Sequence, residues 1–266
     1  MKITMLGTGN ALVTECYNTC FIISDDNKHL LVDGGGGNTV LSRIKSAGIN
    51  WMDIRHIFVT HKHLDHIMGI IWMVRMICQH MRSGKYEGDA YIYSHREVLD
   101  LIKTMSESLI QKKDVEYLGK RLHLIEVVDG EEKEIIGKKM TFFDINSTKA
   151  KQFGFTMMLN DKDKLTCLGD EPFNECERKY ALNSKWLLQE AFCLYSEKDE
   201  FKPYEKNHST VKDACELAKE LNAENVVLYH TEDKNIKNRK KLYTAEGREK
   251  YSGNIFVPDD MEVIEL

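Results

Sequence analysis

Histidine and aspartate side chains are concentrated in residues 60–69, Thr-His-Lys-His-Leu-Asp-His-Ile-Met-Gly. His61, His63, Asp65 and His66 fall there within six consecutive positions. Imidazole nitrogens and a carboxylate, without a thiolate, suit Zn²⁺ and also Mn²⁺ or Fe²⁺. In the alternative interpretation these are ordinary loop histidines and the aspartate only caps a helix. We interpret this motif as a metal-binding segment, because so many ligand types at fixed offsets rarely coincide.

The elements on either side of the motif must position these ligands. Residues 54–60 are apolar and β-branched, which predicts a buried strand, and residues 67–83 predict a largely buried helix. The first two histidines of the motif, on extended backbone, should point the same way because side chains alternate along a strand. The Asp-His pair should lie on the first helical turn and face a second point. We therefore expect one pair of ligands for each of two metal ions.

The sequence of residues 61–66 resembles the His-x-His-x-Asp-His signature of the metallo-β-lactamase superfamily, and it is most similar to the ribonuclease Z-like branch. This resemblance implies an α/β (α+β) fold, the four-layer αββα sandwich of the metallo-β-lactamase type. A chain of 266 residues with 42% hydrophobic content could form one large domain or two small ones. Because no Gly-, Ser- or Pro-rich linker interrupts the sequence, we expect a single domain over residues 1–266.

The resemblance implies further ligands outside the motif. Asp170, in Leu-Gly-Asp, resembles a Ser/Thr-Gly-Asp element whose carboxylate bridges two metal ions, and His230 ends the last strongly predicted strand. Asn146 stands where the family places another histidine, and a neutral amide oxygen is a weaker donor than imidazole. The first ion should therefore be loosely held. The expected ligands are His61, His63, Asp170 and, weakly, Asn146 for the first ion, and Asp65, His66, His230 and the shared Asp170 for the second.

Two further residues resemble acid–base groups of the same branch. Glu190 lies in a predicted strand over residues 186–194 that resembles a His-Glu-Ala-Thr-Phe run, with Gln189 in place of the histidine. His208 lies in an Asn-His-Ser-Thr segment before a predicted helix. The resemblance implies that Glu190 orients His208 and that His208 protonates the leaving oxygen, since an imidazole has a pKa near 6.5. Asp65 would also orient or deprotonate the nucleophile.

Asp33 ends a predicted strand and is followed by four glycines. Glycines allow the backbone to approach a neighbouring segment closely, and a carboxylate at this position could hydrogen-bond the ligand loop and fix its shape. The alternative is a simple acidic turn. The resemblance also implies this supporting role. The strand that ends at Asp33 is expected to form an antiparallel meander with residues 2–6 and 20–24.

Two divalent ions would lower the pKa of a bridging water, so that hydroxide forms near pH 7 and attacks a phosphodiester. We therefore expect a phosphodiesterase or a ribonuclease Z-like nuclease. Only 23 residues separate Asn146 from Asp170, too few for the RNA-gripping arm of many such nucleases, and the net charge is −5. A small phosphodiester, a cyclic nucleotide or a short RNA is as compatible as transfer RNA. An ester, thioester or lactam hydrolase, or a non-catalytic metal-binding sensor, are the alternatives.

The sequence also suggests where the protein acts. Residues 1–7 begin directly with a strand-like alternation and lack the apolar region of a signal peptide, and no apolar run is long enough to span a membrane. The seven cysteines are odd in number and scattered, which indicates reduced thiols. We expect a cytoplasmic enzyme whose partner is a phosphodiester substrate, a small molecule or RNA, with no membrane association. A homodimer is left open.

Overall fold

The computed structural model describes residues 1–266. The chain forms two compact units. The first unit comprises Met1–Gly7, Tyr17–Val128 and Met261–Leu266, and the second comprises Thr8–Cys16 and Asp129–Asp260. Each unit is built on a seven-stranded mixed β-sheet. The single domain over residues 1–266 remains a prediction.

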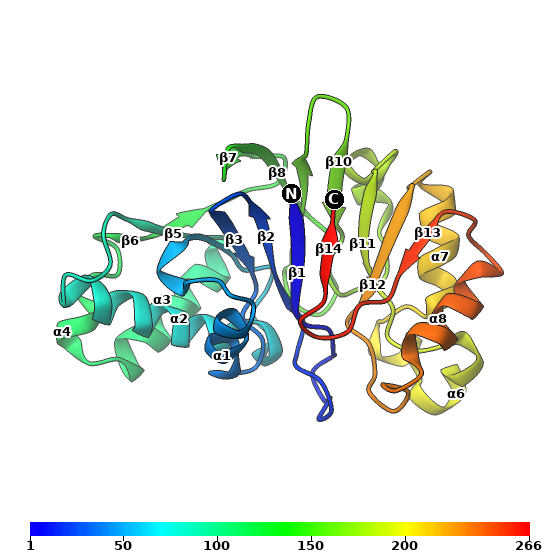
Figure 1. Ribbon diagram of the computed structural model, residues 1–266, viewed down its shortest axis with the longest axis horizontal. Coiled ribbons are helices and arrows are strands. Elements are labelled where there is room, and N and C mark those ends of the chain that lie inside the picture. The colour runs from blue at the N-terminus through cyan, green and yellow to red at the C-terminus, as the bar shows by residue number, and fades with distance from the viewer. The chain divides into compact units, whose positions relative to one another are not determined.

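The sheet of the first unit has the strand order β14-β1-β2-β3-β4-β5-β6 (Figure 1). Strands β1, β2 and β3 pair antiparallel, which confirms the predicted meander, and β3 to β6 pair parallel. Short 3₁₀ helices are labelled η. The elements are β1 (Lys2–Gly7), β2 (Cys20–Asp25), β3 (Lys28–Val32), α1 (Thr39–Ser46), η1 (Trp51–Asp53), β4 (Ile54–Phe58), α2 (Leu64–Arg82), β5 (Ala90–Ser94), α3 (Arg96–Leu109), α4 (Lys112–Val115), β6 (Leu122–Glu126) and β14 (Val263–Glu265).

The helix predicted after the metal-binding motif is α2, which is apolar on the side that packs against the first sheet. Its buried side chains recur at helical spacing and contact Ile57 of β4 and Ile92 of β5 in one core cluster. In Figure 1, α1, α2 and α3 lie along the sheet on the side of this cluster. Burial of this face therefore fixes the first turn of α2, which carries the Asp-His pair of the motif. The buried residues of α2 in the cluster are Ile67, Ile70, Ile71, Met73, Val74, Ile77, Cys78 and Met81.

The sheet of the second unit has the strand order β13-β12-β11-β10-β9-β8-β7. Strands β7 to β10 pair antiparallel, and β10 to β13 pair parallel. The elements are β7 (Glu132–Ile135), β8 (Lys138–Asp144), β9 (Phe153–Met158), β10 (Lys164–Cys167), η2 (Glu175–Glu177), α5 (Arg178–Ala181), β11 (Trp186–Glu190), η3 (Tyr195–Glu197), α6 (Lys198–Phe201), η4 (Tyr204–Lys206), α7 (Val211–Glu220), β12 (Asn225–Tyr229), α8 (Arg239–Arg248) and β13 (Asn254–Phe256).

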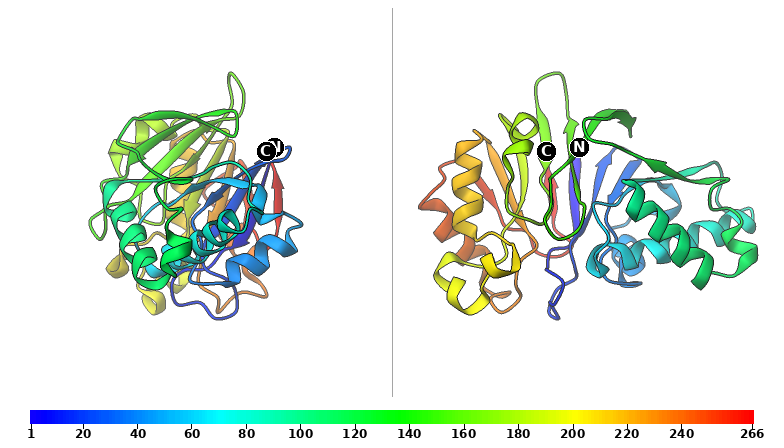
Figure 2. Two further views of the ribbon diagram at one scale, coloured as in Figure 1. Left: turned by 90° about the vertical axis from the view of Figure 1, so that its left-hand side faces the viewer. Right: turned by 180° about the vertical axis from the view of Figure 1, so that it is seen from behind.

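Helix α7 covers one face of the second sheet, as the view from behind shows (Figure 2). Thr210 begins the helix as predicted: its hydroxyl accepts the backbone N–H of Asp213, whose carboxylate accepts the N–H of Thr210. The apolar positions Ala214, Ala218 and Leu221 then pack into the core of this unit. The capping box fixes where the helix starts, and it therefore also fixes the loop that carries His208.

The strand predicted over residues 186–194 is shorter in the structure, where β11 ends at Glu190. From Phe192 onward the backbone pairs with the chain before α7 instead of continuing the sheet. The Phe192 N–H donates to the Ser209 carbonyl at 2.9 Å, and Cys193 forms a β-bridge with Thr210. The prediction of a longer strand was wrong because these apolar residues are buried by a loop pairing that sequence periodicity does not show.

Within each unit, candidate residues follow the carboxyl ends of neighbouring parallel strands. In the first unit Asp33 follows β3, and the motif follows its neighbour β4. In the second unit Asp170, Glu190 and His230 lie at or just beyond the ends of β10, β11 and β12, which are adjacent. The carboxyl ends of parallel strands meet at one edge of a sheet, where open α/β sheets bind ligands. None of the helices combines the length and apolar character needed to cross a membrane.

Candidate metal centre

The first two histidines of the motif face each other. His61 Nε2 lies 2.8 Å from His63 Nδ1, which confirms that the two rings point to a common position. The hydroxyl of Thr60 donates to Asp33 at 2.8 Å and lies 2.9 Å from His61 Nδ1. Because this hydroxyl uses its proton on Asp33, it accepts the proton of His61 Nδ1. The lone pair of His61 is thereby placed on Nε2, on the side of His63, as a metal ligand requires.

The Asp33 carboxylate holds the ligand loop, as predicted. One oxygen accepts the Thr60 N–H at 2.8 Å, and the other accepts the Thr60 hydroxyl and, at 2.7 Å, the Nδ1–H of His66. His66 therefore presents Nε2 forward, and this atom lies 3.3 Å from a carboxylate oxygen of Asp65. A carboxylate behind the ring fixes the tautomer of a ligating histidine and raises its basicity.

Two glycines bring Asp33 this close to α2. A Cβ on Gly34 would lie 2.5 Å from the backbone nitrogen of Ile70, and a Cβ on Gly69 would lie 1.8 Å from the Gly34 carbonyl oxygen. The Gly34 N–H donates to the His66 carbonyl at 2.8 Å. The glycine run predicted to allow a close backbone approach is therefore in contact with the first turns of the ligand-bearing helix.

Replacing Asp33 with asparagine should lower metal affinity roughly tenfold to a hundredfold, the usual cost of losing the group behind a ligating histidine. We also expect the free energy of unfolding to fall by about 1–3 kcal/mol, because an amide cannot accept all three hydrogen bonds. Asparagine tolerates the left-handed backbone of this residue, whose φ is +57°. Metal content after dialysis and urea unfolding of the metal-free protein are the two measurements.

Asp26→Asn is the matched control. Asp26 also has a positive φ, +51°, but it is exposed in the turn between β2 and β3. The same chemical change there should alter neither quantity. If both variants retained metal equally well, the Asp33 carboxylate would not support the ligands.

In the second unit the candidate ligands Asp170 and His230 lie together. His230 Nε2 is 3.5 Å from a carboxylate oxygen of Asp170, and both side chains are buried. The backbone before Asp170 is fixed by the Tyr229 hydroxyl, which donates to the Gly169 carbonyl. Gly169 has a φ of +86°, a backbone conformation that residues with a side chain rarely adopt, which favours glycine here. The ends of β10 and β12 are thereby joined.

His208 lies beside this pair. Its ring centroid is 5.4 Å from that of His230, and its Nδ1 is 3.6 Å from a carboxylate oxygen of Glu190, a distance longer than a hydrogen bond. The other oxygen of Glu190 accepts the Ser209 N–H. Burial raises the pKa of Glu190, and His208 and the Ser209 N–H partly offset that rise. The ring of His208 stacks on Phe192 with centroids 4.7 Å apart, which fixes its plane.

Asn146 follows β8 and is exposed, with a φ of +60°. Its N–H donates to the Asp144 carboxylate at 2.9 Å, so that this turn is closed by a local hydrogen bond. Its weak ligation of the first ion remains a prediction.

Three residues that position the site were missed in the sequence. Thr60 orients His61, and its place directly before the first histidine was the available signal. Glu171 accepts hydrogen bonds from Ser147 and Asn207, and its signal was its place directly after Asp170. Phe192, under His208, carried no signal, because a buried aromatic residue near a strand is usually core.

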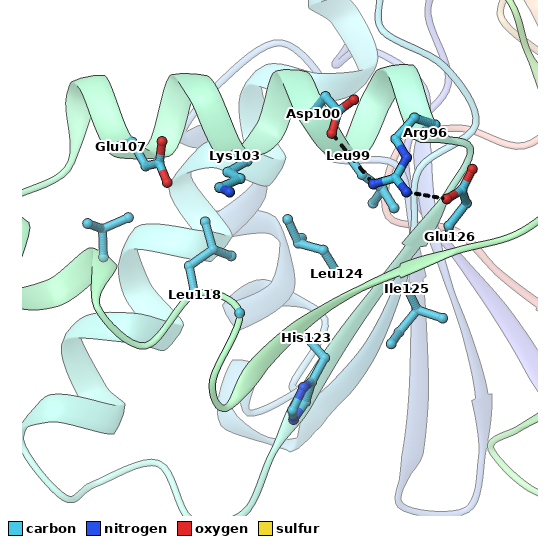
Figure 3. A pocket seen from close by; sticks show the side chains of 12 residues that line it. Arg96, Leu99, Asp100, Lys103, Glu107, Leu118, His123, Leu124, Ile125 and Glu126 are labelled. Atoms are coloured by element: carbon cyan, nitrogen blue, oxygen red, sulfur yellow. Dashed lines mark ion pairs between the residues drawn. The ribbon is translucent and has the colours of Figure 1, made fainter.

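A groove of about 430 Å³ between α3 and β6 contains none of these residues (Figure 3). Apolar side chains such as Leu99 and Leu124 line it, and Arg96 on its rim pairs with Glu126 at 2.9 Å and with Asp100 at 3.9 Å. None of the groups of side chains that could hold a metal ion lies in this groove. We therefore place the chemistry at the strand ends and not in this groove.

The candidate ligands fit a transition-metal ion. Their donors are imidazole nitrogens and carboxylate oxygens, which suit Zn²⁺, Mn²⁺ and Fe²⁺. In the first unit the Nδ1 atoms of two of the histidines already hydrogen-bond Thr60 and Asp33, so that the Nε2 atoms are directed forward. The residues whose side chains could hold a metal ion are His61, His63, Asp65 and His66 in the first unit and Asp170 and His230 in the second.

Sequence comparison finds related proteins over the whole chain. The ribonuclease Z of Archaeoglobus fulgidus is 25% identical, with 100% of this chain and 97% of that protein covered. The ribonuclease Z of Thermococcus sibiricus is 24% identical, with 100% and 96% covered. These similarities support the predicted ribonuclease Z-like branch.

Three solved structures share the fold. The metallo-β-lactamase fold protein YhfI of Bacillus subtilis superposes with a TM-score of 0.76 at 18% identity, covering 99% of each chain. The short form of human tRNase Z gives 0.73 at 21% identity, covering 100% of this chain and 99% of that one. Zn²⁺-bound PqqB of Methylobacterium extorquens gives 0.75 at 11% identity, covering 100% of both. The predicted metallo-β-lactamase fold is confirmed.

Within this superfamily one family profile, described as Anti-Pycsar protein Apyc1, matches residues 1–249, which include every candidate ligand. Because this profile spans most of the chain, the chain belongs to the Apyc1 family of anti-Pycsar proteins.

Proposed function

We propose that this protein is a metal-dependent phosphodiesterase that acts on a small substrate, such as a cyclic nucleotide. The class of reaction, hydrolysis of phosphodiester bonds, is the one predicted, and the ribonuclease Z relatives and tRNase Z support it. The observation that carries the proposal is the place of His208, whose ring lies 5.4 Å from the candidate ligand His230. A phosphodiester with a poor leaving group needs such an acid, whereas an activated ester does not.

The roles of the residues follow from their surroundings. Asp65 would orient the attacking water and accept its proton, and His208 would give a proton from Nε2 to the leaving oxygen. Glu190, facing Nδ1 at 3.6 Å, would stabilise the protonated ring and keep its Nε2 directed outward. When bound, two divalent ions would activate water and offset the charge of the phosphate. Zn²⁺ is the proposed metal, one ion or two, with Mn²⁺ or Fe²⁺ as alternatives, and the assignment of ligands to each ion remains a prediction.

Two observations favour a small substrate over structured RNA. The alignment with the Archaeoglobus enzyme runs over 317 positions, whereas this chain has 266 residues, so that enzyme carries segments without a counterpart here. The net charge of −5 gives no general attraction to a polyanion. Ribonuclease Z activity is the second candidate, and the similarity to the ribonuclease Z proteins favours it. A cytoplasmic location and a homodimer remain predictions.

The test is hydrolysis by the protein loaded with Zn²⁺ or Mn²⁺. We expect turnover of bis(p-nitrophenyl) phosphate and of cyclic nucleotides, little turnover of p-nitrophenyl acetate, and affinity for precursor transfer RNA that is weak at all salt concentrations. Tight, steeply salt-dependent binding and cleavage of the RNA would favour the nuclease instead. Metal uptake without turnover of any diester would contradict the proposal and favour a sensor.

Replacing Asn146 with histidine should strengthen binding of the first ion, by roughly tenfold, and raise the phosphodiesterase rate, since imidazole is a better donor than an amide oxygen. Histidine is among the residues that tolerate a positive φ, so the turn should persist. Elemental analysis after dialysis, followed by diester kinetics, measures both effects.

Asn222→His is the control, because Asn222 is exposed in the second unit and also has a positive φ, +53°. It should change neither metal content nor rate. Full occupancy by two ions in both the parent protein and the Asn146 variant would show that Asn146 does not weaken the first site.

A further inference from the structure

Lys149 is an exposed lysine beside the candidate acid of the second unit. Its ammonium donates to Nε2 of His208 over 3.5 Å, on the side of the ring opposite the atom that faces Glu190. Lys151, two residues further along the same loop, has a different environment, because its ammonium lies 3.6 Å from the Asp144 carboxylate. Lys149 thus directs its charge at the ring that would meet the substrate, whereas the charge of its neighbour is paired.

The loop that carries Lys149 is shaped by Ser147. The Ser147 hydroxyl accepts the backbone N–H groups of Lys149 and Ala150, each at 3.2 Å. It donates its own proton to a carboxylate oxygen of Glu171 at 2.6 Å. The backbone at Lys149 is therefore tied to a buried carboxylate, although its side chain is exposed.

The same carboxylate holds the loop that carries His208. The second oxygen of Glu171 accepts the side-chain amide of Asn207 at 2.8 Å. This amide also lies 3.3 Å from the Thr148 hydroxyl, so the two loops are cross-linked directly as well. Each oxygen of Glu171 thus receives a donor from a different loop. Lys149 and His208 lie side by side because one buried acid hydrogen-bonds a side chain of each loop.

We propose that Lys149 binds a non-bridging oxygen of the substrate phosphate next to His208, and that Glu171 positions both residues for it. This inference rests on the proposed function. A neutral imidazole nitrogen 3.5 Å away is a poor acceptor for an ammonium, and an anionic phosphate oxygen is a much stronger one. A phosphate bound there takes the ammonium from Nε2, and that nitrogen can then take up a proton from water, which the imidazolium gives to the leaving oxygen. Lys149 keeps its own proton throughout.

The test compares Lys149→Ala with Lys149→Arg and with the matched control Lys151→Ala, which removes the same charge from the same loop. In metal-loaded protein, we expect Lys149→Ala to raise the KM for bis(p-nitrophenyl) phosphate and the inhibition constant of inorganic phosphate roughly tenfold, as for the loss of a charged hydrogen bond. Arginine should restore most of both. The Lys151 variant should stay within about twofold of the parent, since paired surface charges contribute little.

Inorganic phosphate also separates this inference from the proposed function. If the parent protein hydrolysed no diester, calorimetric titration of metal-loaded protein with phosphate would still show weaker binding in Lys149→Ala than in Lys151→Ala. That result would support the anion-binding role of Lys149 and contradict the proposed phosphodiesterase activity. Equal phosphate affinity in the two alanine variants would overturn the inference, whatever the activity.

Glu171→Gln tests the positioning role. The amide of glutamine places a donor against either Ser147 or Asn207, so one loop should loosen. We expect faster hydrogen exchange in residues 146–150 or 203–208, a roughly tenfold loss of phosphate affinity, and a fall in kcat that Lys149→Ala does not share, because His208 is displaced as well. Parent-like exchange together with parent-like affinity would contradict this role.

Discussion

Asp170→Asn is expected to lower kcat/KM for phosphodiesters on the order of a thousandfold, which corresponds to about 4 kcal/mol of transition-state stabilisation. Asp170 is the ligand predicted to be shared by both ions, and an anion between two dications offsets their mutual repulsion. Asparagine keeps the shape of the side chain and removes the charge. Metal content should therefore fall together with activity, as measured by elemental analysis after dialysis and by diester kinetics at saturating metal.

Loss of folding could imitate this result, and the structure offers a way to separate the two. The backbone at Asp170 is fixed through the Gly169 carbonyl and the Tyr229 hydroxyl, neither of which the substitution alters. The near-ultraviolet circular dichroism and the urea midpoint should therefore stay close to those of the parent. Asp161→Asn, in the exposed turn between β9 and β10, is the control for the same chemical change. If the variant kept the activity and metal content of the parent, Asp170 would not be a metal ligand.

His208→Ala should slow diesters with alkoxide leaving groups roughly a hundredfold to ten-thousandfold, the range for loss of a general acid. Diesters of p-nitrophenol should lose much less, because nitrophenolate leaves without protonation. The position of the ring between Phe192, Glu190 and Lys149 explains why a loop histidine would have this role: its plane, its Nδ1 and its Nε2 each have a neighbour. The measurement is the ratio of the two rate losses in the metal-loaded enzyme.

His123→Ala controls for loss of an imidazole elsewhere. This residue is partly exposed in the first unit and pairs with Asp89 at 2.9 Å. Its removal should leave both rates unchanged. Equal losses on both kinds of diester in His208→Ala would mean that the ring helps to shape the site without giving up a proton.

Local sequence information predicted the geometry around the candidate ligands well. The alternation of side chains on extended backbone placed the rings of His61 and His63 on one side, and their nitrogens are 2.8 Å apart. The four glycines after Asp33 predicted a close backbone approach, which occurs at α2. These inferences succeeded because strand alternation, helical spacing and glycine geometry are set by residues that are near one another in the chain.

Features that depend on distant residues were not predictable. Lys149 and His208 are separated by 59 positions, and only the folded second unit shows that Glu171 joins their loops. Strands β13 and β14 have three residues each, too few for an alternation pattern. These features depend on packing and strand pairing between residues that are far apart in the sequence.

Asp33, Asn146 and His230 adopt left-handed backbone conformations within two residues of the ends of their strands, with φ between +57° and +60°. For an aspartate or a histidine this geometry costs roughly 1–2 kcal/mol, which a glycine would recover. Thermostabilising design that substitutes glycine at such positions would therefore select against the side chains proposed to act here. A library screened for heat resistance alone should accumulate glycine at these three positions and yield well-folded, inactive proteins. Such a screen should therefore keep the three residues unchanged.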